Sequence, residues 1–414
     1  MLPYDEIAAA IRRLHLRPMG EIPLHEPRFG PRERDLLLDC LDSTFVSSVG
    51  AYVGRAETML QEITGAAHAV ATVNGTSALH AALLVCGVAR DDEVLTQPLT
   101  FVATANAIRY CGAHPVFLDV DRTTLGMAPR ALERFLQHRC DRRSDGTLVN
   151  RASGRRVTAC LPVHIFGHPC AVDEIAALCA FHGLPLVEDA AEALGSHWQG
   201  RHCGTFGRVG TLSFNGNKIV TCGGGGAVLT GDAELARRLK HLTTTAKAPH
   251  PWRYEHTETG YNYRLPNLNA ALLCAQLEQL EVFVADKRRL ADEYAECCPG
   301  LGLTVVREPE GSRANCWLNA ILLDNAADRD AFLAAMHERG ILCRPAWTLL
   351  QRLPMYAACE HDALTNAIWL EERLVNLPSS VRAGVTLRET SPAANLFSPR
   401  PYPGEGLGER ALLW

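Results

Sequence analysis

The chain has 414 residues, 47% of them hydrophobic, and its 41 basic and 46 acidic residues give a formal charge of -5. A chain of this size and composition can bury one large core or two smaller ones, which excludes a disordered or fibrous protein. It contains no Lys/Arg-rich run that could follow phosphates along a duplex, so we expect no nucleic-acid partner.

The N-terminus and the cysteines indicate the compartment. The first residues, MLPYDEIAAAIRRLHLRPMG, mix charges of both signs with short apolar stretches, unlike a signal or transit peptide. No stretch reaches the roughly 18 uncharged apolar residues that a membrane span needs. The 15 cysteines are scattered along the chain, and we interpret them as reduced thiols rather than a disulfide framework. We therefore expect a cytoplasmic protein with no membrane partner.

Apolar strand-like runs alternate with helical patterns from residue 65 to 215. The helical runs ALHAALLVCG, TANAIRYCG and AVDEIAALCAFHG each end on glycine, which best tolerates a left-handed C-cap. This alternation is typical of a doubly wound α/β domain, whose ligands bind outside the carboxyl ends of the strands. The predicted strands are 68–73, 93–97, 114–120, 157–165, 184–189 and 210–214.

Other segments complete the organisation. Residues 142–157 are polar and predict a surface hairpin, and residues 267–298 form a long helical stretch that leaves the first domain. A smaller α+β unit follows, with WLNAILL and ILCRPAW as strands around the helix ADRDAFLAAMHERG. We divide the chain into an N-terminal arm (1–30), a large α/β domain (31–266), a small α+β domain with its linking helix (267–382) and a C-terminal tail of unassigned structure (383–414).

The run VNGTSALHAALL places a turn and a helix start directly after the first predicted strand. Gly75 turns the chain, and Thr76 and Ser77 open the helix, where free amides and the helix dipole attract anions. An ordinary helix cap explains the same residues equally well. The phosphate fingerprints GxxxxGK[ST] and GxGxxG are absent, so a phosphate bound here would belong to another kind of cofactor.

The run LVEDAAEALG carries two acids at or beyond the end of a strand that otherwise looks buried. Asp189 is placed to hold a positive charge, and Glu192 lies one turn further on if a helix begins there. The alternative is that Asp189 caps that helix, and taken alone an isolated aspartate favours this interpretation.

The run TLSFNGNKIVTCGGGGAVL sets Lys218 between a strand and a glycine-rich stretch in a mostly apolar setting. An amine in an apolar pocket has a depressed pKa, as Schiff-base chemistry requires. A solvated loop lysine beside a hairpin turn is the alternative. A phosphate cradle, a strand-end aspartate and a secluded lysine, in this order, together match the needs of pyridoxal phosphate (PLP): a phosphate anchor, a pyridinium partner and an imine-forming amine.

One histidine and cysteine grouping suggests a metal. Cys160, His164, His168 and Cys170 lie close together in sequence, but Cys160 and His164 fall in a predicted strand, where their side chains lie too far apart for one ion. We predict no metal site.

Eight ordered motifs carry a resemblance to the DegT/DnrJ/StrS family of sugar aminotransferases, which have the aspartate-aminotransferase fold. The resemblance covers about residues 20–382. The motifs are FVSSVG (45–50), NGTSALHAAL (74–83), TFVATANAI (100–108), VHIFGH (163–168), EDAAEALGS (188–196), SFNGNKIVTCGGGG (213–226), GYNYRLPNLNAA (260–271) and NLPSS (376–380).

The resemblance implies roles around the cofactor ring. Lys218 would carry PLP covalently, and Asp189 would pair with the pyridinium nitrogen. Phe101 would stack on the ring, with a core aromatic as the alternative. Glu192 would lie near the phenolic oxygen, where many relatives carry Gln or His, so this contact would be tuned differently here, for example through a protonated carboxyl.

The resemblance also implies how the phosphate is held. Thr76, Ser77 and Ser213 would surround it, in agreement with the helix start at Gly75. Asn262 would reach it from the other subunit, with a turn residue as the alternative. The active site would then be shared across a homodimer.

The expected reaction is a ping-pong transamination. L-Glutamate would donate its amino group, and PLP, cycling through pyridoxamine phosphate, would pass it to a keto carbon of a nucleotide-linked sugar. Variants of the SSVG, GNK and GYNYRLPN motifs occur in enzymes resembling the aminotransferase of the legionaminic acid pathway, which acts on a UDP-linked 4-keto-6-deoxy sugar bearing an acetamido group. We therefore expect amination at C4 of a UDP-linked 6-deoxy keto sugar, for bacterial surface-glycan or nonulosonic acid biosynthesis.

The stretch TTTAKAPHPWRYEHTETGYNYR carries cations and aromatics just ahead of Asn262. A nucleotide-sugar diphosphate needs cations that a neutral sugar would not, so we assign Lys247 and Arg253 to its pyrophosphate. A solvated loop with incidental charges is the alternative.

Three other functions remain open. A sugar dehydratase of the same fold would carry histidine in place of Lys218. A non-catalytic regulator that binds PLP or a sugar nucleotide is the second, although no helix-turn-helix is evident. A dehydrogenase is the third, and the missing GxGxxG disfavours it.

Overall fold

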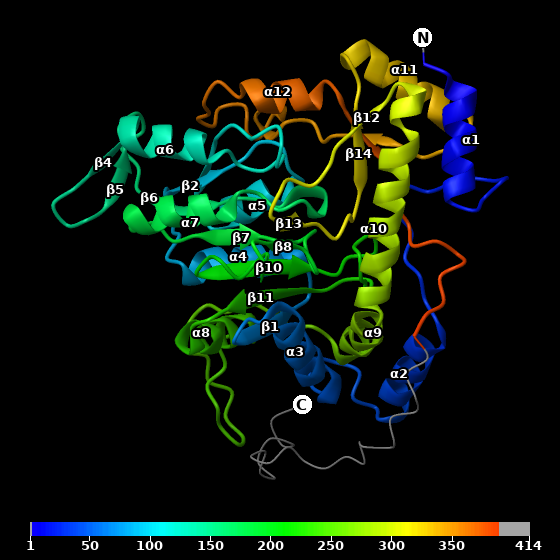
Figure 1. The fold of residues 1–414 in the computed structure, drawn as a ribbon. Helices are drawn as coiled ribbons and strands as arrows, with labels where there is room; N and C mark the ends of the chain where they lie inside the picture. The colour runs from blue at the N-terminus through cyan, green and yellow to red at the C-terminus, as the bar shows by residue number, and fades with distance from the viewer. Residues whose placement is uncertain (1, 389–414) are drawn as a thin grey trace.

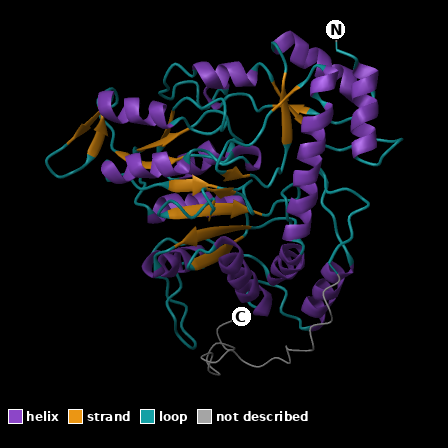
Figure 2. Cartoon of the chain, in the orientation of Figure 1, coloured by secondary structure: helices purple, strands orange, loops and turns teal. Residues whose placement is uncertain are grey.

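The computed structural model describes residues 2–388. Strands β3, β2 and β6 pair in parallel, and β7, β10, β11 and β1 form the next set in that spatial order. Parallel bridges Cys160↔Leu186 and Val163↔Asp189 join the two sets into one twisted layer, which Figure 2 shows as a stack of strands between helices. The strands are β1 His68–Thr72, β2 Glu93–Thr96, β3 His114–Phe117, β6 Val157–Leu161, β7 Val187–Asp189, β10 Val209–Ser213 and β11 Gly226–Thr230.

All six strands predicted for this sheet are present, and β11 is the one that the sequence prediction missed. β11 runs antiparallel to both neighbours, β10 and β1. Because the two antiparallel pairings cancel, β1 runs parallel to β10 and its carboxyl end lies at the same edge of the sheet. The chain reaches β11 through the glycine-rich stretch, which hides the start of the strand in the sequence.

Helices cover both faces of the sheet, and the strands between them are almost wholly buried. Figure 1 shows the layers. The predicted glycine C-caps are confirmed, because Gly87, Gly112 and Gly183 follow α4, α5 and α7 with φ of 87, 77 and 59°. The helices are α2 Pro31–Asp42, α3 Ala51–Thr64, α4 Gly75–Val85, α5 Ala103–Tyr110, α6 Pro129–His138, α7 Val172–Phe181 and α8 Ala233–Thr243.

Short elements decorate this domain. The predicted surface hairpin is present as β4 Cys140–Arg142 paired with β5 Leu148–Asn150. A three-stranded ribbon combines β8 His197–Trp198 and β9 Arg201–His202 with β13 Ser312–Arg313 from far along the chain. This ribbon ties the segment after β7 to the beginning of the second domain.

The helical stretch predicted at 267–298 consists of two helices rather than one. α9, Asn267–Glu278, and α10, Leu280–Cys297, meet at Gln279 with a bend of 56°. The second domain packs against α10. It holds an antiparallel sheet in the order β12-β14-β16-β15 and the helices α11 Ala326–Glu338 and α12 Thr365–Glu371. The strands are β12 Thr304–Val305, β14 Asn319–Leu322, β15 Arg344–Pro345 and β16 Leu374–Leu377.

The segment expected to be an N-terminal arm carries a helix, α1, at Tyr4–Leu14. Its buried residues Ile7 and Ile11 pack in one cluster with α10, α11 and the small sheet. An amphipathic helix of this kind needs a neighbour to cover its apolar face, and the second domain supplies it. Of the predicted tail, residues 389–414 lie outside the described residues.

All 15 cysteines fall within the described residues and all are free thiols, in agreement with the prediction. Between residues 2 and 388, no single helix has the length and apolar character of a membrane span. The helices α9 and α10 meet these two criteria only when the bent pair is counted as one segment.

Candidate active site

Most of the predicted cofactor-site residues converge at the carboxyl edge of the large sheet. Asp189 is the last residue of β7 and Ser213 the last of β10, while Gly75 opens the helix that follows β1. Phe101 lies in the connection from β2 to α5. Because these strands run in parallel, their carboxyl ends meet along one edge, where ligands of such sheets bind.

The start of α4 is built as an anion site. Asn74 is the N-cap, and its side-chain oxygen accepts the Ser77 N–H at 2.8 Å. Asn74 therefore caps the helix, and the hydroxyls of Thr76 and Ser77 are not needed for this. The N–H groups of Gly75 and Thr76 precede the first intrahelical donor, the Ala78 N–H, and point out of the helix end, where they favour a bound anion.

Two glycines explain how this helix start reaches the sheet. A Cβ on Gly75 would lie 2.8 Å from the Ser213 Cβ, and a Cβ on Gly226 would lie 2.6 Å from the main-chain carbonyl of Asn74. Neither position has room for a side chain, so α4 packs directly on the ends of β10 and β11. This close approach sets the Ser213 hydroxyl beside the helix N-terminus.

Asp189 is buried, and hydrogen bonds hold both of its oxygens. Thr104 Oγ1 donates to one at 2.8 Å, and the Ala191 N–H donates to the other at 3.2 Å. Burial raises the pKa of Asp189, while the bond from Thr104 and the charge of Lys218 oppose the rise. Residues after Asp189 form turns and not a helix, so the helix-capping interpretation of Asp189 is wrong. A buried carboxyl of this kind is suited to hold a cation.

Phe101 is 53% exposed, which excludes the core-aromatic interpretation. Its carbonyl accepts the N–H of Thr104, the residue that holds Asp189, at 3.3 Å. Phe101 and Asp189 are thus linked through one short segment. An exposed aromatic ring on a segment that also holds a buried carboxyl is suited to stack on a planar, cationic ligand.

Lys218 lies in the segment after β10, and its side chain contacts Glu192 in the segment that follows β7. Its Nζ is 3.1 Å from Glu192 Oε1 and 4.1 Å from the centroid of the Trp317 ring. The other Glu192 oxygen accepts the Phe166 N–H at 2.8 Å. Burial raises the pKa of Glu192, and the charge of Lys218 lowers it in part. The amine is therefore held between an aromatic face and a buried acid.

Sequence reasoning missed two residues of this site, Asn315 and Trp317. The Asn315 side-chain amide donates to the main-chain oxygens of Glu192 and Leu194 at 2.8 and 2.9 Å. The Trp317 Nε1–H donates to the Asn217 carbonyl at 2.7 Å, next to Lys218. Both lie just before β14, far from the other site residues in sequence. The one sequence feature that could have indicated them is the asparagine and the tryptophan in RANCWLN, the segment that leads into β14.

The chain has four lysines, so the surroundings of each can be compared. Lys287 is fully buried in α10, and its Nζ donates to the main-chain oxygens of Trp317, at 3.1 Å, and Ser379. Burial lowers the pKa of Lys287 to about 7, and its two carbonyl partners occupy it. Lys240 is an exposed residue of α8 that pairs with Glu57. Of the four, Lys218 alone lies among buried acids at the carboxyl edge of the sheet.

Lys247 lies over the ring of Tyr254, 4.2 Å from its centroid, on a hairpin between α8 and α9. The hairpin is closed by the bridge Lys247↔His256 and projects from the body of the molecule (Figure 1). Arg253 is exposed near its tip, 3.7 Å from Glu255. The structure therefore does not bring Lys247 or Arg253 into the Lys218 group of the same chain.

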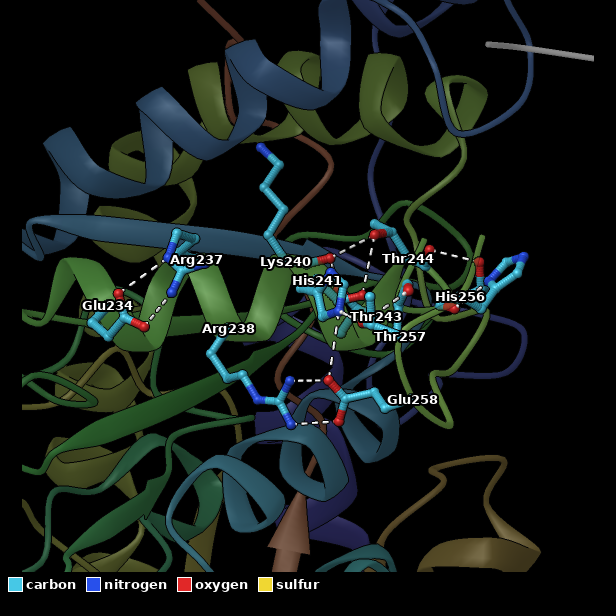
Figure 3. Close-up of polar contacts among 12 residues, drawn as sticks. Glu234, Arg237, Arg238, Lys240, His241, Thr243, Thr244, His256, Thr257 and Glu258 are labelled. Atoms are coloured by element: carbon cyan, nitrogen blue, oxygen red, sulfur yellow. Dashed lines mark hydrogen bonds and ion pairs between the residues drawn. The ribbon is translucent and has the colours of Figure 1, made fainter. Parts of the chain in front are cut away.

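The base of this hairpin is braced against α8, as Figure 3 shows. The His241 ring hydrogen bonds to the Thr257 hydroxyl at 2.8 Å, and Arg238 pairs with Glu258. Asn262 follows the hairpin and bridges to Thr244 in a short extended segment. Because it is bridged in an extended segment, Asn262 is not a turn residue; it is exposed and is not part of the Lys218 group in this chain.

The histidine and cysteine grouping is explained by internal contacts. His164 Nε2 lies 3.1 Å from Glu188 Oε2, and its other ring nitrogen accepts the Cys170 N–H at 3.2 Å. The Cys160 thiol contacts the Met127 sulfur at 3.7 Å. In residues 2–388, no group of three or more His, Cys, Asp or Glu side chains is arranged to hold a metal ion.

Comparison with known proteins adds to this geometry. A model of the DegT/DnrJ/EryC1/StrS aminotransferase family matches residues 27–386. The GDP-perosamine synthase of Escherichia coli O157:H7 is 35% identical over 363 residues, which cover 87% of this chain and 94% of that protein. EpsN of Bacillus subtilis (strain 168), described as a pyridoxal phosphate-dependent aminotransferase, is 36% identical over 337 residues, 81% of this chain and 84% of that protein.

A solved structure gives the same result for the fold. The aminotransferase TlmJ from Streptoalloteichus hindustanus matches with a TM-score of 0.79 and 29% identity, over 87% of this chain and 94% of that one. The predicted PLP-dependent transferase fold is confirmed.

Proposed function

Because the chain belongs to the DegT/DnrJ/EryC1/StrS aminotransferase family and is a PLP-dependent sugar aminotransferase, we propose that it moves the amino group of L-glutamate to C4 of a nucleotide-linked 4-keto-6-deoxy sugar, with Lys218 as the cofactor-bearing residue. The observation that carries this assignment is the pairing of Lys218 with a buried acid, Glu192, at 3.1 Å, on the sheet edge where Asp189 also lies. Lys240 also pairs with a buried acid, Glu57, but its own side chain is 60% exposed and lies on α8, and neither Lys247 nor Lys287 pairs with an acid at the sheet edge.

The residues at the sheet edge fit the parts of PLP. The N–H groups at Gly75 and Thr76, with the Thr76, Ser77 and Ser213 hydroxyls, would hold its phosphate. The tight packing of Gly75 on Ser213, where a Cβ would be 2.8 Å from the serine Cβ, supports a cradle for a small anion.

The ring of PLP would lie between the remaining residues. Phe101 would stack on it, Asp189 would pair with the pyridine nitrogen, and Glu192 would contact the phenolic oxygen. The exposed ring of Phe101 and the buried, hydrogen-bonded carboxyl of Asp189 support these roles.

When bound, PLP supplies an electron sink for the carbanion that forms at the substrate carbon. The chain's own residues would prepare and use it. Asp189, whose two oxygens accept the Thr104 hydroxyl and the Ala191 N–H, would pair with the pyridine nitrogen and keep it protonated. Lys218, once released, would carry the proton between the two carbon positions. The cofactor would alternate between PLP and pyridoxamine phosphate over the two half-reactions.

The nucleotide and the sugar are the finer part of the proposal. The SSVG, GNK and GYNYRLPN motifs favour a UDP-linked substrate bearing an acetamido group, for surface-glycan or nonulosonic acid biosynthesis. A GDP-linked substrate is the second candidate, because the relative at 35% identity is named a GDP-perosamine synthase and no relative reported above is a legionaminic acid enzyme. Incubation with UDP-, GDP- and dTDP-linked 4-keto-6-deoxy sugars and L-glutamate, followed by mass spectrometry, separates them. Amination of none of these sugars would refute the proposal.

We also propose a homodimer with shared sites. The exposed Asn262 would reach the phosphate of the partner's cofactor, which accounts for its absence from the Lys218 group in its own chain. Mixing inactive Lys218→Ala and Asn262→Ala chains and allowing subunits to exchange should restore activity, since one site of each mixed dimer then contains both native residues. Absence of restored activity in verified mixed dimers would place Asn262 and Lys218 of each site on the same subunit.

A further inference from the structure

Glu192 is held through both its carboxyl group and its main chain. Its Oε2 accepts the Phe166 N–H at 2.8 Å, and its main-chain oxygen accepts the Asn315 amide at 2.8 Å. Its Oε1 faces the Lys218 ammonium at 3.1 Å, and its side chain is 5% exposed. The carboxyl therefore cannot turn away toward water, and its position relative to the Lys218 nitrogen is set by neighbours on two domains.

Lys218 is the one ion-pair partner of Glu192 among residues 2–388. The closest like charge, Asp189, raises the pKa of Glu192 in addition to the effect of burial. His25 lies against Trp317 with ring centroids 6.4 Å apart, and its pKa is held well below the usual value by burial and by Lys287 and Lys218, so it is neutral. His164 is engaged by Glu188. The negative charge of Glu192 thus depends on the positive charge of Lys218.

Attachment of PLP to Lys218 as a neutral imine would remove that positive charge. An ammonium has no lone pair, so Lys218 must release a proton before its nitrogen can bond to the carbonyl carbon of the cofactor. The carbonyl oxygen then leaves as water, and a carbon–nitrogen double bond forms. A buried carboxylate whose cation disappears in this way is strongly destabilised as an anion.

We propose that Glu192 is the group that takes this proton. The N–H bond of Lys218 breaks, an O–H bond forms at Glu192 Oε1 across the 3.1 Å contact, and the carboxyl stays neutral while Lys218 is bonded to the cofactor. When substrate releases Lys218, the proton returns to the amine. This inference rests on the role of Lys218 as the cofactor-bearing residue.

The chain offers a matched control in Glu57. Its Oε2 lies 3.1 Å from Lys240 Nζ, and its Oε1 accepts a main-chain N–H, that of Ala71, at 3.1 Å. The contact is the same in kind, but the Lys240 side chain is 60% exposed and has no part in the site. A substitution there reports on loss of a glutamate without loss of the proposed proton acceptor.

Infrared difference spectroscopy of the apo-protein before and after PLP addition tests the proposal. Wild type and Glu57→Gln should gain the carbonyl stretch of one protonated carboxyl, and Glu192→Gln should not. The gain should persist in Asp189→Asn. Glutamine preserves the acceptor for the Phe166 N–H, and circular dichroism checks that the variant is folded.

Three outcomes would overturn the inference: no new band in wild type, a band that survives in Glu192→Gln, or a band lost only in Asp189→Asn. Visible absorbance recorded on the same samples reports whether PLP is attached at all. If wild type fails to become yellow on PLP addition, the assignment of Lys218 fails, and this is distinguishable from failure of the proton transfer.

Discussion

Two lysine–glutamate pairs in this chain have the same local geometry but differ in the exposure of the lysine, since the side chains of Glu192 and Glu57 are 5% and 11% exposed. Lys218 and Glu192 are 3.1 Å apart, as are Lys240 and Glu57, and each glutamate also accepts one main-chain N–H. The Lys218 side chain is 12% exposed, whereas the Lys240 side chain is 60% exposed and reaches from α8 toward α3 (Figure 3).

The difference shows that burial, not the contact, makes a pair reactive. In water an exposed ion pair contributes only about 0–1 kcal/mol, and each partner keeps its charge when the other is removed. In the interior, the charge of each partner depends on the other, because an unpaired buried charge costs roughly 3–5 kcal/mol. The Lys218–Glu192 pair can therefore pass a proton. Proton transfer in the Lys240–Glu57 pair would bring no gain in free energy, because Lys240 lies in contact with water.

The largest contrast should come from the two lysines. Lys218→Ala should abolish turnover and prevent PLP from being held covalently, because no other amine is available at the site. The purified wild type should be yellow and this variant should not retain a covalently bound cofactor after denaturation. Lys240→Ala, the matched control, should leave colour and turnover unchanged. Wild-type transamination by Lys218→Ala would contradict the assignment.

Asp189→Asn tests the second buried acid. Asparagine keeps the shape and can still accept the Thr104 hydroxyl, but it removes the charge that holds a pyridinium proton. We expect turnover to fall by roughly 10²–10³-fold, the range seen when a preorganised electrostatic group is lost. Circular dichroism should show the helix content of the wild type. Loss of that helix content would mean that Asp189 has mainly a structural role.

A smaller effect is expected on the exposed side of the comparison, at the hairpin. Lys247→Ala or Arg253→Ala should raise the KM for the sugar nucleotide by about tenfold or more, because charge-assisted contacts to phosphate contribute roughly 1.5–3 kcal/mol each. The glutamate half-reaction should change little.

The control for the hairpin is Arg237→Ala, which removes an exposed cation of α8 that pairs with Glu234 (Figure 3). Equal damage to both half-reactions would indicate disruption of the cofactor site or the dimer. No effect on either half-reaction would mean that Lys247 and Arg253 belong to a solvated loop and do not bind the pyrophosphate.

The smallest effect concerns stability at the surface pair. Lys240→Ala should change the free energy of unfolding by no more than about 1 kcal/mol, because the Lys240 side chain is 60% exposed and the Ala71 N–H still holds the Glu57 carboxylate. Urea titration of wild type and variant at equal protein concentration measures the difference. A loss of several kcal/mol would show that the Lys240–Glu57 contact is energetically like a buried pair. Burial of the lysine would then not explain the difference between the two pairs.

Much of the large domain could be predicted from the sequence because its signals are short-range. Buried parallel strands appear as apolar runs, and the glycines after α4, α5 and α7 mark helix ends by their backbone freedom. Since those strands run in parallel, the predictions also put Gly75, Asp189, Ser213 and Lys218 at one edge. The strand β11 escaped because its start is glycine-rich, and β16 because it has only four residues, Leu374–Leu377, all of them buried, and so shows no alternation.

The sequence by itself determined which residue types meet at the sheet edge, since strand direction alone brings their positions together. Only the tertiary structure decided what each one does there. Asp189 could equally have capped a helix, until the fold turned the chain after it and set the Thr104 hydroxyl against it. Trp317 and Asn315 reach the site from the other domain. In the sequence they lie 100 and 123 residues from the residues they bind, Asn217 and Glu192. Such contacts leave no local pattern, because they arise from packing between distant segments and not from the propensities of either one.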